Sequence, residues 1–171
     1  IAPQLRGWIS ADRIGAWSDA TSGNQWLSIS GNHIAVGAPN EGSPGSGQGR
    51  VAWLYNSTAS WTTGTVTGGY FDEPSGQGSG FGASVSIAGG LLAVSSPGAS
   101  TNGRVFVYDW TANANAAPVN TATTLTTTGY GGNGRIGTAI DMQLVGTTYI
   151  LAVGAPAEGT GNGELYVYTG T

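Results

Sequence analysis

The chain contains an internal repeat of about 60 residues, and this repeat limits its possible folds more than any other feature. A short apolar string ending in proline occurs three times, at residues 34–39 (IAVGAP), 92–97 (LAVSSP) and 151–156 (LAVGAP). After a Gly-rich loop, a second string follows each copy, at residues 49–55 (GRVAWLY), 103–108 (GRVFVY) and 163–168 (GELYVY). Because both strings recur in the same order, the sequence predicts three copies of one supersecondary unit that stack to share a core.

Each unit is predicted to form a meander of antiparallel strands. In the first two units, a tight turn at residues 31–32 or 89–90 separates the first string from an earlier strand. A Thr-rich stretch at residues 61–67 or 120–128 is expected to add a fourth strand. The third unit has a few extra residues near 146–149 and no matching Thr-rich stretch, so we expect it to lack a fourth strand of its own.

The repeat also predicts how the chain is divided. We expect a single domain over residues 1–171, with units at approximately 10–67, 68–128 and 129–171. The opening segment, residues 1–9, belongs to no unit. Since an unpaired strand edge exposes backbone donors and acceptors, we expect this segment to serve as a closing outer strand.

Both faces of the expected third strand of each unit are apolar. Val105 and Val107 point to one side of the strand, whereas Phe106 and Tyr108 point to the other. A sheet with one solvated face would alternate apolar and polar residues, so this pattern requires sheets stacked face to face. The sequence therefore predicts an all-β fold with four-stranded antiparallel blades of β-propeller type, with a two-sheet sandwich as the alternative.

The order of these motifs resembles the FG-GAP repeat of integrin α-chain propellers. Phe81-Gly82 precedes the second Pro-ending string, Ile136-Gly137 takes the same place in the third unit, and residues 23–24 of the first unit lack the pair. The Gly-Ala-Pro element itself stands in residues 34–39 and 151–156. The resemblance covers nearly the whole chain and implies an extracellular or cell-surface protein that uses its propeller for adhesion, ligand binding or an accessory role.

The composition disfavours several classes of partner. The net charge is -4 and the five basic residues are all Arg, so no basic field is available to bind nucleic acid. No apolar run approaches the roughly 20 residues of a membrane span, so we expect no membrane insertion. The absence of Cys excludes disulfides, thiolate metal sites and Cys nucleophiles.

A calcium site of the kind found in the resembled family is not expected. That family often binds calcium in a loop patterned Asp-x-Asp-x-Asp-Gly-x-x-Asp, and the corresponding turns of this chain offer no carboxylate. Asp72, Glu73 and Glu41 are interpreted as solvated loop charges rather than as metal ligands. We predict no metal and no cofactor, and a melting temperature that falls by less than about 5 °C in chelator.

The sequence does not favour an enzyme. His33 is the single histidine and adjoins a turn before an apolar strand, where a packing role is expected. Residues 132–137 (GNGRIG) match a dinucleotide-binding fingerprint, but they precede a strand rather than open a helix. We therefore predict no catalytic residues.

The tryptophans are the candidate ligand-binding residues. Sugars stack their apolar faces on indole rings. Trp53 is expected to pack between blades, because Val107 and Val167 hold the same position in the other units. The remaining candidates, for which packing is the competing interpretation, are Trp17, Trp26, Trp61 and Trp110.

Together these patterns favour an extracellular, non-catalytic adhesion or assembly module that binds partner proteins or copies of itself. A carbohydrate-binding lectin is the alternative, and an accessory part of a larger secreted enzyme is a weaker one. Asn56 begins an Asn-Ser-Thr sequence, so it is a predicted glycosylation acceptor if the protein is secreted by a eukaryotic cell.

Three blades are too few to close a ring, since propellers have roughly four to eight. We therefore expect a homodimer or larger assembly, in which two copies bring six blades together. A complementary chain that carries the remaining blades is the alternative.

Overall fold

The computed structural model describes residues 26–40, 48–58, 61, 64–74, 80–99, 102–111, 118, 123–125, 135–157 and 162–171. Within these residues the chain forms eleven strands and no helix. The prediction of an all-β fold is confirmed. The expected closing strand at residues 1–9 lies outside the described residues.

The strands form three antiparallel sheets, each a meander in which neighbouring strands are consecutive in the chain. Sheet 1 contains β1 (Leu27–Ser30), β2 (His33–Ala38), β3 (Arg50–Asn56) and β4 (Val66–Asp72). Sheet 2 contains β5 (Val85–Ala88), β6 (Leu91–Ser96), β7 (Arg104–Asp109) and β8 (Thr123–Leu125). Sheet 3 contains β9 (Ala139–Val145), β10 (Thr148–Ala155) and β11 (Glu164–Gly170). Each sheet therefore contains one copy of the two repeated strings, although β4 extends sheet 1 beyond the expected boundary at residue 67.

Two-residue turns join the first two strands of sheets 1 and 2, as predicted. Ser30 pairs with His33 across Gly31-Asn32, and Ala88 pairs with Leu91 across Gly89-Gly90. Gly89 and Gly90 have φ of 53° and 94°, angles that favour glycine and suit the tight turns of hairpins.

The fourth strand of sheet 1 differs from the prediction. A strand was expected over residues 61–67, whereas β4 covers Val66–Asp72. Glycine weakens strands, so the Gly68-Gly69 pair favoured a break at this point. Gly69 instead lies against the indole of Trp53, where an added Cβ would come within 3.2 Å of Nε1. Close approach to a large ring, rather than a turn, explains this glycine.

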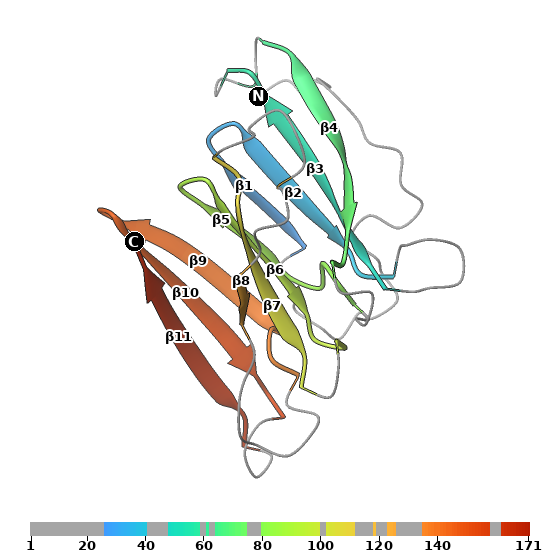
Figure 1. Cartoon of the computed structure of the whole chain (residues 1–171), viewed down its shortest axis with the longest axis vertical. Coiled ribbons are helices and arrows are strands. Elements are labelled where there is room, and N and C mark those ends of the chain that lie inside the picture. The colour runs from blue at the N-terminus through green and yellow to red at the C-terminus, as the bar shows by residue number, and fades with distance from the viewer. Residues whose placement is uncertain are drawn as a thin grey trace, which may run out of the picture.

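The three sheets stack face to face, with sheet 2 between the other two (Figure 1). Sheets 1 and 2 share one core of buried residues, here called the first junction, which includes Val51, Trp53 and Phe106. Sheets 2 and 3 share another, the second junction, which includes Val105, Met142 and Leu151. Neighbouring sheets approach each other most closely at their first strands, β1 with β5 and β5 with β9. The face-to-face stacking agrees with the prediction, and the three sheets form an open stack.

The two junctions repeat the same hydrogen bonds. At the first junction, the Ile87 N–H donates to Ser28 Oγ at 3.0 Å. At the second, the Met142 N–H donates to Ser86 Oγ at 2.9 Å. Each serine therefore satisfies an outward-facing N–H on the first strand of the next sheet. The sheet register places the two serines at equivalent positions.

The aromatic-Gly pair crosses between sheets. The Phe81 N–H donates to the Gln48 carbonyl at 2.9 Å, and the Ile136 N–H donates to the Asn102 carbonyl at 2.8 Å. An added Cβ on Gly37 would lie 1.8 Å from the Gly82 carbonyl oxygen, so the approach requires glycine. Backbone contact between units thus accounts for part of the Gly content.

Candidate binding surfaces

The tryptophans predicted as ligand sites lie in different environments. Trp110 is 0% exposed, and its ring centroid lies 4.5 Å from that of His33 and 6.1 Å from that of Trp53. A sugar cannot stack on a buried ring, so Trp110 is a packing residue of the first junction. Trp61 is partly exposed, and its Nε1 donates to the Gly31 carbonyl at 2.8 Å, which holds the β1–β2 turn.

Of the other two tryptophan candidates, one lies within the described residues. Trp26 is partly buried just before β1, and its Nε1 atom is buried. Trp17 lies outside the described residues. The structure therefore does not bring the four candidates together into one site within the described part of the chain.

His33 occupies the predicted packing position. It is buried, and its ring lies 5.2 Å from that of Tyr55 in addition to its contact with Trp110. Burial lowers the pKa of His33. Its Nε2 has no hydrogen-bond partner within the described residues, so nothing there orients the imidazole as a base.

Asn56, the predicted glycosylation acceptor, does not lie on an exposed loop. It is the last residue of β3 and is 1% exposed. Its Oδ1 accepts hydrogen bonds from the backbone N–H of Thr58 at 2.8 Å and from the Thr58 hydroxyl at 3.2 Å. A glycan attached to Nδ2 needs an exposed amide, which this arrangement does not provide in the folded chain.

The three acidic residues interpreted above as solvated loop charges lie in different environments. Asp72 is paired with Arg50, whose Nε and Nη2 donate to its two carboxylate oxygens at 3.0 and 3.2 Å. Glu73 is buried, and Glu41 lies outside the described residues. Among the described residues, no group of three His, Cys, Asp or Glu could hold a metal ion.

The open side of sheet 1, here called the β1 face, is apolar. The register places Leu27, Ile29 and Ile34 on this side. Leu27 and Ile29 are each 56% exposed, although their equivalents on β5, Val85 and Ile87, are buried in the first junction. These two exposed residues are therefore those that a preceding sheet would cover.

The open side of sheet 3, here called the β11 face, is the counterpart at the other end of the stack. Leu165 is 69% exposed, whereas its equivalents Val51 and Val105 are fully buried. Val167 is also exposed on this face. Asp141 shares the face and takes the register position that Ser28 and Ser86 hold at the two junctions. The β11 face is thus equivalent to the side of sheet 1 that packs on sheet 2 and to the side of sheet 2 that packs on sheet 3.

A hollow lies at one end of the β11 face. Its volume is about 420 Å³, and its walls include Gly154, Gly163 and Leu165. Gly154 and Gly163 are equivalent to Gly37 and Gly49, the residues on which the Phe81-Gly82 pair lies at the first junction. The hollow therefore corresponds to the place where the next unit would cross.

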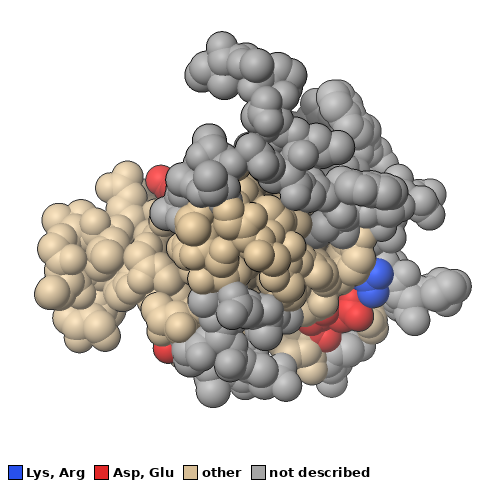
Figure 2. All heavy atoms as spheres, turned by 90° about the horizontal axis from the view of Figure 1, so that it is seen from above, with Lys and Arg blue, Asp and Glu red and all other residues tan. Residues whose placement is uncertain are grey.

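Few charged side chains appear on the described surface seen from above (Figure 2). The described part of the chain contains no helix that would cross a membrane. Most of the exposed large apolar residues of the described part of the chain lie on the two end faces.

Comparison of the sequence with models of known protein families gives no match, and no curated protein matches it. The resemblance to the FG-GAP repeat therefore rests on the motifs alone. The function has to be argued from the two end faces and the junctions between the sheets.

Proposed function

We propose that this chain is a non-catalytic assembly module, whose β1 and β11 faces bind each other between copies. The observation that supports this most directly is the repeat equivalence. Each end face carries the residues that one side of a buried junction carries, but none of the described sheets lies over them. Monomeric proteins rarely leave such contiguous apolar faces open.

The β11 face is suited to accept the first strand of another sheet. Leu165 supplies the apolar contact that Val51 and Val105 supply at the internal junctions. Asp141 would supply the oxygen acceptor that Ser28 and Ser86 supply, through the carboxylate oxygen other than Oδ1, which accepts a hydrogen bond from Ser86 Oγ at 3.4 Å. A carboxylate accepts a stronger hydrogen bond from a backbone N–H than a hydroxyl does.

The β1 face provides the complementary half. Leu27 and Ile29 would fill the positions that Val85 and Ile87 fill at the first junction. By the same register, the Ile29 N–H lies on the outer edge of β1, as the Ile87 N–H lies on the outer edge of β5. Contact between the two faces would therefore repeat both the apolar packing and the hydrogen bond.

An extracellular setting and a role in adhesion remain part of this proposal, because the FG-GAP resemblance implies them. Two copies joined through both pairs of faces would bring six sheets together, within the range of closed propellers. The residues of the first unit that would enter the hollow of the β11 face, 23–24, lie outside the described residues.

Light scattering coupled to size-exclusion chromatography tests the proposal. We expect a mass of at least twice the 17.1 kDa of one chain. Leu165→Asp places a charge on the β11 face and should shift the protein to the monomer. Leu144→Asp is the matched control, because Leu144 is also exposed on β9 but faces the opposite side of sheet 3. A folded wild-type monomer would contradict the proposal.

A further inference from the structure

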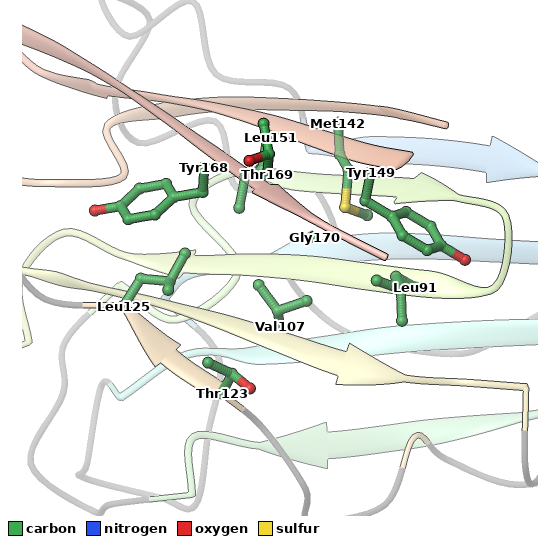
Figure 3. Close-up of a pocket in the computed structure, with 10 residues that line it drawn as sticks. All are labelled: Leu91, Val107, Thr123, Leu125, Met142, Tyr149, Leu151, Tyr168, Thr169 and Gly170. Atoms are coloured by element: carbon green, nitrogen blue, oxygen red, sulfur yellow. The ribbon is translucent and has the colours of Figure 1, made fainter. Parts of the chain in front are cut away.

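The second junction contains a partly open cavity between sheets 2 and 3, with a volume of about 180 Å³. Figure 3 shows side chains of both sheets pointing toward this space. Its walls are formed by Leu91, Val107, Thr123, Leu125, Met142, Tyr149, Leu151, Tyr168, Thr169 and Gly170. Most of these side chains are apolar or aromatic, so the cavity provides an environment for an apolar group.

The equivalent space at the first junction is filled by indole rings. The register places Val107 at the position of Trp53, because these residues pair with Ala93 and Ala35 respectively. Gly170 takes the position of Trp110, two residues after the equivalent tyrosines Tyr168 and Tyr108.

Trp53 and Trp110 meet edge to face at the first junction, with their centroids 6.1 Å apart. At the second junction Tyr149, which pairs with Gly170 and stands where sheet 2 has Gly90, brings a ring to one wall of this space. Val107 and Gly170 leave the rest unfilled, so the cavity corresponds to part of the space that the indole side chains occupy in the neighbouring repeat.

The walls of the cavity are held in place independently of any ligand. The Tyr149 hydroxyl donates to the Gly89 carbonyl at 2.9 Å, which ties β10 to the β5–β6 turn. Met142 and Leu151 are buried in the second core. A preformed apolar cavity of about 150 Å³ stays dry and binds benzene, so this larger one has room for a ring.

We propose that this cavity binds a flat, uncharged aromatic ring of about the size of indole. The ring would lie where Trp110 lies at the first junction, between the positions of Val107 and Gly170. A charged ring is disfavoured, because the apolar walls supply no partner for a buried charge. The ring comes either from a free small molecule or from a tryptophan side chain of a peptide, and both sources share this chemistry.

Met142 provides a direct readout of binding. It is the single methionine of the sequence and forms part of the cavity wall, so methyl-labelled methionine gives one resonance from this position. Titration with indole is expected to shift this resonance saturably through the ring current. N-acetyl-tryptophanamide, titrated in parallel, tells whether the cavity also accepts a peptide-borne ring. Absence of a saturable shift with both probes would overturn the proposal.

Val107→Trp places at the second junction the residue that sheet 1 has at the same position. We expect this variant to bind indole at least tenfold more weakly, because its own side chain occupies the cavity. The matched control is Thr124→Trp, since Thr124 is exposed on β8 and faces the opposite side from Thr123 and Leu125. Thr124→Trp should bind indole like the wild type.

A folded Val107→Trp variant with unchanged affinity would overturn the proposal, because it would place the ligand elsewhere. If Val107→Trp does not fold, Val107→Phe serves as the smaller filling substitution. Nuclear Overhauser contacts between indole protons and the Met142 methyl of the wild type then locate the ligand without any variant. Saturable indole binding without these contacts would also overturn the proposal.

Discussion

At the scale of single residues, His33 shows how the first junction differs from the second. It packs against Tyr55 and Trp110, whereas its equivalent Leu91 lines the cavity. Burial disfavours the charged form of an imidazole in this position.

The stability of the protein should therefore depend on pH through His33. Burial lowers its pKa in the folded chain below the ordinary value of 6.5. Between these two pKa values the unfolded chain binds the proton more strongly, so the stabilisation is complete above pH 6.5 and decreases as the pH falls below it. We expect urea denaturation at pH 7.5 and 5.5 to show this loss.

His33→Leu introduces the residue found at the equivalent position of sheet 2, and it should reduce the loss of stability between these two pH values. The carboxyl groups titrate mainly at lower pH and are the same in both proteins. An equal loss in the variant and the wild type would show that His33 is not responsible.

Trp110 is the second residue whose role can be measured directly. Trp110→Ala should lower the free energy of unfolding by about 3–5 kcal/mol, because it removes a fully buried ring and leaves a cavity. Trp61→Ala is the comparison, since the ring of Trp61 is partly exposed and its loss removes one hydrogen bond worth about 1 kcal/mol. Chemical denaturation of both variants tests the difference; equal effects would contradict the packing role of Trp110.

At the scale of strands and sheets, much of the fold was predictable from the sequence because the unit recurs. The strands around the Pro-ending strings and the two-residue turns were found as expected. The position of β4 was not, because the contact between Gly69 and Trp53 joins residues of different strands. Local composition alone favours a break there.

The candidate surfaces were less predictable than the strands. Comparison of the repeats identified Trp53 as a packing residue, but Trp110 follows β7, where its equivalent is Gly170 and no pattern indicates burial. The serines that join the sheets could not be recognised in the sequence, because Ser and Thr are abundant throughout it. The exposure of Leu27, Ile29 and Leu165 could not be predicted from the sequence alone, because their equivalents in the other repeats are equally apolar. The order in which the sheets stack also has to be known.

The hydrogen bonds between the first strands give a prediction for a single hydroxyl. Ser86→Ala removes the acceptor of the Met142 N–H and should lower the free energy of unfolding by about 1–3 kcal/mol, the cost of a buried donor without a partner. Ser30→Ala, near the β1–β2 turn, serves as the control with a smaller expected effect. Thermal or urea denaturation measures both, and equal effects would argue against a stabilising role for this hydrogen bond.

At the scale of the whole molecule, the two end faces differ from each other, so the proposed association through them would be head to tail. Ile29→Asp should block only the β1 face and Leu165→Asp only the β11 face. Each variant alone is expected to be monomeric. Mixed at equal concentration they should form a 1:1 dimer, because each retains the face that the other has lost.

Light scattering of the mixture tests this expectation. A mixture that stays monomeric although both variants are folded would contradict pairing of unlike faces. Dimers of either variant alone would indicate that a face binds its own kind.

The unequal filling of the two junctions has a geometrical consequence for any ring built from these sheets. Neighbouring sheets approach most closely at their first strands, so each pair acts as a wedge whose opening angle depends on the bulk between the later strands. Trp53 and Trp110 supply this bulk at the first junction, whereas a cavity lies beside Val107 and Gly170 at the second. In a ring of such sheets, the curvature, and with it the number of sheets in a full turn, would therefore depend on a few side chains between the later strands.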